Sequence, residues 1–223
     1  MKREWSRKEL AGMVDHTLLK AQAGEADLRR HCAEARRYGF AAVCVNPCWV
    51  GLAAAELEGS GIGVTSVVGY PLGANSTETK AAEASLAAAQ GATGIDMVMN
   101  IGFAKSGDWK RVAEDIAAVV RAARPIPVKV IIETCQLDRE EKVLACRAAL
   151  AAGADCVMTS TGFGTGGATV EDIALMRQTL GETLKIKASG GIRTRSDAIA
   201  LLEAGAYRIG ASAGVAIVAG AED

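Results

Sequence analysis

The chain has 223 residues, half of them hydrophobic and few of them aromatic, and its net charge is −1. This length suits one domain, and the near-neutral charge gives no general attraction to nucleic acid or to a membrane surface. Six cysteines without CxxC spacing and only two histidines leave few ligands for a zinc site. The charged start MKREWSRKEL lacks the apolar core of a signal peptide, and no apolar stretch reaches membrane-spanning length. We therefore expect a reduced, cytoplasmic protein without a metal or a cofactor.

Short apolar runs alternate with Ala-rich amphipathic segments along the whole chain. Ser6 and Glu9 have capping-box spacing and predict a short helix near the N-terminus. Later helices are expected to stop at Gly91, Gly153 and Gly205, because glycine suits the left-handed position that follows a helix. The predicted strands are residues 14–18, 41–45, 63–68, 94–99, 127–133, 154–159, 184–188 and 206–209.

The alternation of these strands with helices predicts a parallel sheet, and eight units predict that the sheet closes. The expected fold class is α/β, with a single (β/α)8 TIM barrel over residues 1–223 and a short N-terminal helix. The alternative is an open doubly wound sheet. Its nucleotide-binding GxGxxG pattern after an early strand is missing, so the closed barrel is favoured.

Charged residues occur inside several of the predicted strands, where function is expected at the carboxyl ends. Asp96 lies in the apolar run GIDMVMN and is either a structural ion-pair partner or an acid or base, which we favour. Lys187, at the end of LKIKA, is a candidate acid, electrophile or imine former, whereas Lys185 on the same face is expected to be structural. Lys129 remains undecided, with Glu133 as a partner for it or for Lys187.

Two further polar positions and one cysteine lie in early strands. Asp15 either orients a substrate hydroxyl or fixes the local turn, and His16 is expected to be structural. Cys44 either faces the barrel mouth or is an ordinary buried strand cysteine.

Glycine-rich loops follow the last three predicted strands: STGFGTGGA, ASGGIRT and GASAG. Glycine lets the backbone approach an anion closely, and free N–H groups can hold it. Barrel enzymes often build a phosphate site from the last two loops. Together the three loops predict a phosphate site.

Seven segments in order, VDHTLLK, AVCVNP, GIDMVMNIG, KVIIET, TSTGFG, KASGGIRT and GAS, resemble deoxyribose-phosphate aldolase over nearly the whole chain. The resemblance implies a class I Schiff-base lyase of deoxyribonucleotide catabolism. Such an enzyme reversibly cleaves 2-deoxy-D-ribose 5-phosphate to D-glyceraldehyde 3-phosphate and acetaldehyde, without a metal or a cofactor. It implies that Asp96 relays protons and that Lys187 assists the nucleophile. The candidate substrate-binding residues are Asp15, Cys44, Lys129, Thr161, Gly162, Gly190, Gly191, Gly210 and Ser212.

One residue departs from the family pattern, which has its Schiff-base lysine immediately before TSTG. This chain has Met158 there, and a thioether cannot form an imine. We therefore expect binding of the sugar phosphate and the aldehyde with impaired or redirected cleavage. The explanations are a deliberate Lys→Met replacement, a natural non-catalytic relative, or imine formation on Lys187. Against the last, loss of a neighbouring cation should return the pKa of Lys187 toward about 10.4.

Two other classes of function remain open. One is a non-catalytic sugar-phosphate-binding barrel, and the other is an isomerase that uses Asp96 and Lys187 as acid and base. Barrels of this kind commonly pair through outer helices, so the resemblance also implies a homo-oligomer, a dimer or a tetramer.

Overall fold

The computed structural model describes residues 4–219 and contains a closed barrel of eight parallel strands, each paired with its neighbours in chain order. The predicted barrel is confirmed, and the open sheet is wrong. The ends of the predicted 1–223 domain, residues 1–3 and 220–223, lie outside the described residues. The strands are β1 (Val14–Leu18), β2 (Ala42–Val45), β3 (Gly63–Val68), β4 (Gly94–Val98), β5 (Val128–Ile131), β6 (Cys156–Met158), β7 (Lys185–Ser189) and β8 (Arg208–Ala211).

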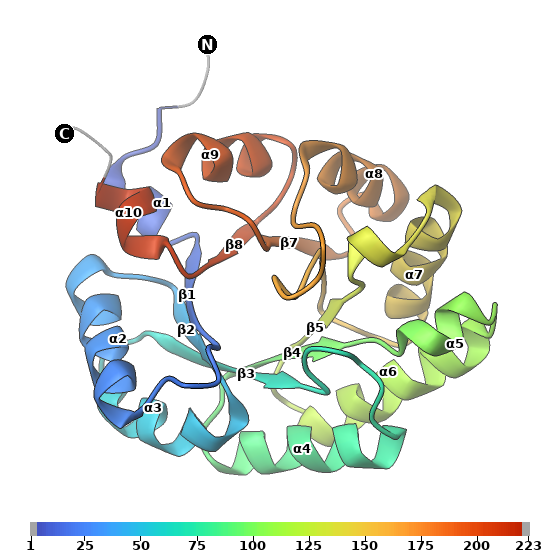
Figure 1. The fold of residues 1–223 in the computed structure, drawn as a ribbon, viewed down its shortest axis with the longest axis horizontal. Helices are drawn as coiled ribbons and strands as arrows, with labels where there is room; N and C mark the ends of the chain where they lie inside the picture. The colour runs from blue at the N-terminus through green and yellow to red at the C-terminus, as the bar shows by residue number, and fades with distance from the viewer. Residues whose placement is uncertain (1–3, 220–223) are drawn as a thin grey trace.

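Helices form a ring around the strands, and α1 lies beside α10 where the ring closes (Figure 1). Each strand is followed by at least one α-helix, which is the arrangement that covers the outer face of a parallel barrel. The helices are α1 (Arg7–Ala11), α2 (Glu25–Tyr38), α3 (Val50–Leu57), α4 (Thr77–Ala89), α5 (Ile101–Lys105), α6 (Trp109–Ala123), α7 (Arg139–Ala151), α8 (Val170–Leu180), α9 (Arg195–Glu203) and α10 (Gly214–Ala219), with 3-10 turns η1 (Pro47–Trp49) and η2 (Thr134–Gln136).

The helix boundaries follow the predicted signals. The Ser6 hydroxyl accepts a hydrogen bond from the Glu9 N–H, and the Glu9 carboxylate accepts one from the Ser6 N–H, which completes the capping box of α1. Gly91, Gly153 and Gly205 have φ values of 99°, 77° and 115°, which residues with a side chain rarely adopt. Each of them therefore ends its helix and turns the chain back toward the next strand.

The core is built from Val, Ile, Leu and Ala on both sides of the barrel wall, and every residue of β4 is buried. Within residues 4–219, no helix is long and apolar enough to cross a membrane. Glycine also brings loops together at the carboxyl ends of the strands. A Cβ at Gly167 would lie 2.2 Å from the Gly190 carbonyl oxygen, so the loops after β6 and β7 can pack backbone against backbone only without it.

Candidate active site

Five strands bring a chain of alternating charges together inside the barrel. The Lys187 Nζ atom on β7 lies 2.6 Å from Asp15 Oδ2 on β1 and 2.7 Å from Asp96 Oδ2 on β4. The other Asp96 oxygen lies 2.7 Å from the Nζ atom of Lys129 on β5. Arg208 on β8 approaches the second Asp15 oxygen at 3.4 Å. Each carboxylate in this cluster therefore contacts two cations, which offsets the cost of burying it.

The charged forms of these groups are stabilised by one another. Burial alone would raise the pKa of Asp96, but the Lys129 and Lys187 ammonium groups lower it to about 2. Burial opposes the charged form of Lys187, yet Asp15 and Asp96 outweigh it and raise the pKa of Lys187 well above its ordinary value. The sequence led us to expect that the pKa of Lys187 returns toward its ordinary value, and the two aspartates raise it instead. Lys187 keeps its proton at neutral pH, which disfavours imine formation on it.

The two lysines of β7 occupy different environments, as predicted. Lys187 is fully buried, and a Cβ at Gly210 on β8 would lie 3.0 Å from its Cε atom, so glycine leaves room for the lysine chain. Lys185 begins the strand, is exposed, and holds its Nζ atom 5.1 Å from the centre of the Tyr207 ring. It therefore lies at the amino end of the strand, away from the charge cluster.

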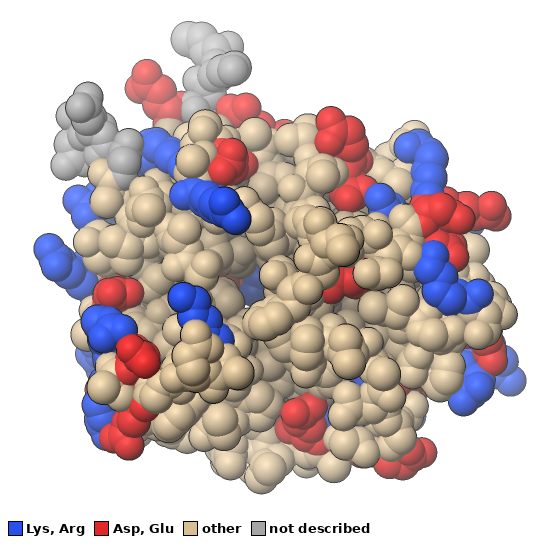
Figure 2. Space-filling view, in the orientation of Figure 1, with Lys and Arg blue, Asp and Glu red and all other residues tan. Residues whose placement is uncertain are grey.

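A pocket of about 280 Å³ lies above the charge cluster, at the carboxyl ends of the strands. Figure 2 shows that this face is hollowed near its centre, with basic side chains beside the hollow. Asp15, Lys129 and Lys187 do not line the pocket and lie beneath it, within reach of Asp96 or of one another. The predicted residues that do line it are Cys44, Asp96, Met158, Thr161, Gly162, Gly190, Gly191, Gly210 and Ser212.

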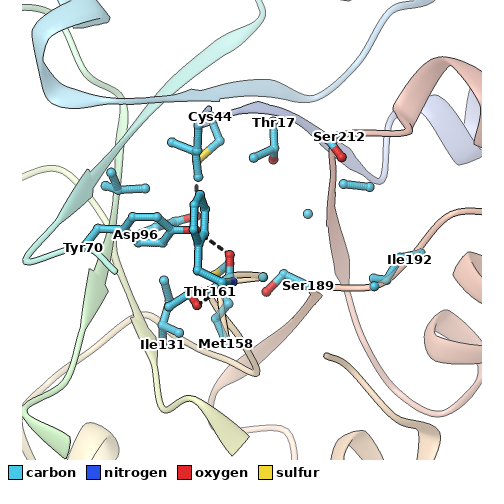
Figure 3. A pocket seen from close by; sticks show the side chains of 18 of the residues that line it. Thr17, Cys44, Tyr70, Asp96, Ile131, Met158, Thr161, Ser189, Ile192 and Ser212 are labelled. Carbon is cyan, nitrogen blue, oxygen red and sulfur yellow. Dashed lines mark hydrogen bonds between the residues drawn. The ribbon is translucent and has the colours of Figure 1, made fainter. Parts of the chain in front are cut away.

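Met158 lies on the floor of this pocket beside the charge cluster. It is the last residue of β6 and the register partner of Lys187 on β7. Its side chain packs with Val98 and Ile131, and Tyr70 covers this small apolar cluster (Figure 3). The residue before TSTG is therefore adjacent to Lys187, as the site hypothesis requires.

Thr161 is held by residues from two other loops. Its N–H lies 3.3 Å from one Glu133 carboxylate oxygen, and its hydroxyl donates to the same oxygen at 2.5 Å. Its carbonyl accepts a hydrogen bond from the Tyr70 hydroxyl, and its hydroxyl oxygen accepts one from the Phe163 N–H at 3.0 Å (Figure 3). The N–H and hydroxyl donors of Thr161 are thus both engaged before any ligand binds.

The expected pairing of Glu133 with a lysine is wrong. Within residues 4–219, Lys129 and Lys187 pair with aspartates, and Glu133 binds Thr161 instead. The reason is local: Glu133 follows β5 with a left-handed backbone, φ 53°, which takes it out of the strand pattern. A buried carboxylate in this conformation costs free energy, and such strain is commonly found where a loop must be held in place.

Cys44 lines the pocket and is also a buried strand residue, so both interpretations of it hold together. Its sulfur lies 3.9 Å from Asp96 Oδ2. Burial, reinforced by the Asp96 charge, raises the pKa of the Cys44 thiol to about 12. Cys44 is therefore a neutral thiol and a poor nucleophile in this conformation.

Among the further residues that line the pocket, four that the sequence did not single out bear on its chemistry: Lys20, Tyr70, Phe163 and Arg193. Lys20 ends VDHTLLK and Arg193 lies in KASGGIRT, so a search of the motifs for cations would have found both. Nothing in the sequence around Tyr70 indicates that its side chain reaches a loop ninety residues later.

His16, His31 and Glu34 form a cluster whose potential ligand atoms lie within 4.8 Å of one another. The two imidazole rings stack with centres 3.9 Å apart and planes 17° apart. Ring lone pairs lie in the ring plane, so parallel stacked rings cannot both point at one ion. His16 Nε2 lies 2.9 Å from the Glu34 carboxylate, and His31 Nε2 lies 3.0 Å from the His16 carbonyl. The cluster ties β1 to α2, in keeping with a structural role for His16.

Comparison with known proteins agrees with this geometry. The profile of the DeoC/LacD family of aldolases matches residues 10–220. A deoxyribose-phosphate aldolase of Caldanaerobacter subterraneus is 55% identical over 221 residues, 98% of this chain and 96% of the relative. Deoxyribose-phosphate aldolase 2 of Bacillus licheniformis is 58% identical over 214 residues, 96% of each chain. The solved deoxyribose phosphate aldolase of Aeropyrum pernix, described as a unique tetramer, superimposes with a TM-score of 0.90 at 33% identity, covering 96% of this chain and 91% of that one. The barrel, the site at its mouth and these matches together show that the chain belongs to the DeoC/LacD aldolase family.

Proposed function

We propose that this chain derives from a deoxyribose-phosphate aldolase and keeps the site of that enzyme apart from its nucleophile. Met158 stands in place of the nucleophilic lysine and strongly reduces cleavage of 2-deoxy-D-ribose 5-phosphate. The observation that carries the proposal is the register pairing of Met158 with Lys187 on the pocket floor. A lysine at position 158 would have a cation beside it, which favours the neutral amine that attacks a carbonyl. Methionine has similar length but offers no such amine.

Asp96 and Lys187 retain the features that the proton-transfer roles require. Asp96 lines the pocket and accepts hydrogen bonds from two ammonium groups, Lys129 and Lys187, which are the proton donors that a relay through its carboxylate would draw on. Asp15 shares Lys187 and fixes its position. We therefore assign proton relay to Asp96 and Lys187 and a positioning role to Asp15 and Lys129.

We assign the phosphate to the rim formed by the loops after β7 and β8, near Gly190, Gly191, Gly210 and Ser212. Lys20 and Arg193 also line the pocket and add positive charge for an anion, which supports this choice. Gly162 completes the rim from the β6 loop. The Thr161 donors are engaged by Glu133, so we assign Thr161 the role of holding Gly162 in place.

Binding without turnover is the second candidate function. It is favoured by the state of Lys187, whose ammonium group is buried between two carboxylates and cannot replace the missing amine. The isomerase alternative is weaker, because the family profile and the relatives that match this chain are aldolases.

We further propose that the protein acts in the cytoplasm as a homo-oligomer on small phosphorylated sugars and aldehydes. The support for assembly is the tetramer described for the Aeropyrum pernix relative. Light scattering after size-exclusion chromatography tests this part, and a monomer at micromolar concentration would contradict it.

The experiment compares the unaltered chain with Met158→Lys and with Met158→Leu as a matched apolar control. We expect 2-deoxy-D-ribose 5-phosphate to raise the melting temperature of all three proteins, because the phosphate rim is intact. Acetaldehyde release should appear only in Met158→Lys, at least about 100-fold above the others, since the nucleophile divides the difficult step in two. A folded Met158→Lys protein that binds the sugar phosphate without cleaving it would refute the site assignment.

A further inference from the structure

Tyr70 reaches from the β3 loop into the pocket. Its hydroxyl donates a hydrogen bond to the Thr161 carbonyl on the far side, and its ring meets the Phe163 ring edge-on, with centres 5.6 Å apart and planes at 88°. In Figure 3 the side chain extends between Cys44 and Met158 and ends at Thr161. The side chain therefore links the loops after β3 and β6 across the barrel mouth.

The loop that carries Tyr70 is firmly anchored. The Gly69 N–H donates to the Glu83 carboxylate at 2.7 Å, and the Gly73 N–H donates to the Gly69 carbonyl at 2.7 Å. Beneath it, the Lys80 chain packs so closely that a Cβ at Gly69 would lie 2.9 Å from its Cε atom. An aromatic side chain on an anchored loop has few alternative positions, so it can act as a fixed wall.

This wall covers the reacting end of the pocket. Cys44, Asp96 and Met158 all line the pocket, yet their exposed fractions are only 2%, 0% and 6%. Tyr70 packs on the apolar cluster that contains Met158. Across the pocket from its backbone lie the polar side chains of Ser189 and Ser212 (Figure 3). The pocket therefore has an apolar side under Tyr70 and a polar side at the glycine rim.

We propose that Tyr70 is the residue that sets the size of the group a ligand can place against position 158. A two-carbon unit, such as one derived from acetaldehyde, fits beside a fixed ring, whereas a branched or longer donor aldehyde meets the ring. This inference rests on the proposed function only in taking position 158 as the reacting end. The hydrogen bond to Thr161 keeps the ring in place, and the ring itself supplies the bulk.

Cys44 provides a test that needs no turnover, because it lines the pocket under Tyr70 and a neutral maleimide that reaches it can alkylate its small thiolate fraction. We would measure alkylation of each cysteine by peptide mass spectrometry with a small probe, N-methylmaleimide, and a bulky one, N-cyclohexylmaleimide. Cys48, which is exposed, is the accessible reference. Cys156, which is buried and does not line the pocket, reports on opening of the barrel.

In the unaltered chain we expect slow labelling of Cys44, with a strong preference for the small probe. Tyr70→Phe should keep that preference and raise the rate only about fivefold, which corresponds to one hydrogen bond of about 1 kcal/mol. Tyr70→Ala should raise the rate further and bring the preference down to that of Cys48.

Two results would overturn the proposal. One is an unchanged size preference at Cys44 in Tyr70→Ala, because the ring would then not be the wall. The other is equal acceleration at Cys44 and Cys156, because Tyr70 would then stabilise the barrel rather than close a pocket. Neither result bears on whether Met158→Lys restores cleavage, so the two proposals fail separately.

Discussion

Among residues 4–219 two lysines are fully buried, and both form short ion pairs, but they lie in different places. Lys187 points into the barrel and lies between Asp15 and Asp96, under the pocket. Lys80 on α4 lies outside the barrel wall, where it meets Asp115 on α6 at 2.7 Å and the Val98 carbonyl at 3.0 Å. Burial and pairing alone therefore do not distinguish a functional lysine from a structural one.

The difference lies in the number of carboxylates around each ammonium group. Burial lowers the pKa of Lys80, because one aspartate only partly compensates for lost hydration. Two aspartates raise the pKa of Lys187 despite the same burial. The barrel cluster has redundant partners and a cavity above it, so each aspartate keeps one cation even when the Lys187 charge is removed. The Lys80–Asp115 pair between α4 and α6 has one cation for one carboxylate, which suits a fixed structural contact.

The largest expected effect that separates the two lysines is on turnover, measured in the Met158→Lys background. Adding Lys187→Met should lower kcat about 10²- to 10⁴-fold, because a proton-transfer group is lost. Adding Lys80→Met should leave most of the turnover of the folded enzyme, since Lys80 lies outside the pocket. Steady-state acetaldehyde release measures both, and equal losses would remove the distinction.

For stability we expect the opposite order, with Lys80→Met more harmful than Lys187→Met. The measurement is urea unfolding of each single substitution in the unaltered chain. Lys80→Met leaves Asp115, among its partners in the described part of the chain, only the Thr77 hydroxyl and should cost about 3–5 kcal/mol. Lys187→Met leaves each aspartate a cation, Arg208 for Asp15 and Lys129 for Asp96, and should cost only about 1–2 kcal/mol. A larger loss for Lys187→Met would show that the cluster is not redundant.

The smallest expected effect is on the pH dependence of stability, and its sign differs between the two lysines. The pKa of Lys80 is below its unfolded value of 10.5, so the unfolded chain binds more protons and stability rises with pH toward that value. The pKa of Lys187 is raised, so its contribution is complete below 10.5 and is lost as pH rises above it. Urea unfolding between pH 8 and pH 11 gives the slope of the unfolding free energy against pH. The contribution of each lysine to that slope should disappear in its own Lys→Met variant. Slopes of the same sign would contradict the assignment.

The sequence predicted the eight strands and their order because apolar runs alternate with helices whose ends carry recognisable signals, such as the Ser6 capping box and the glycines at positions 91, 153 and 205. It also predicted that Asp96, Lys187 and position 158 meet, since parallel strands end at one rim. The strands and their buried polar residues follow from periodicity and from the position of a residue within its strand, whereas the importance of position 158 follows from the family resemblance.

The contacts that were missed depend on loop geometry or on helix packing. Lys80 and Asp115 read as ordinary exposed charges of amphipathic helices, and only the packing of α4 against α6 buries them. Glu133 left its expected partners because its backbone turns left-handed after β5. Tyr70 acts across the mouth from a loop whose path no local pattern specifies.

The most direct measurement is to trap the imine with acetaldehyde and borohydride and to locate the adduct by peptide mass spectrometry. In Met158→Lys we predict a reduced ethyl adduct on the lysine introduced at position 158 and none on Lys187. In the unaltered chain we predict no adduct in either peptide. An adduct on Lys187 of the unaltered chain would contradict the account, because that amine would then be free despite its two carboxylate partners.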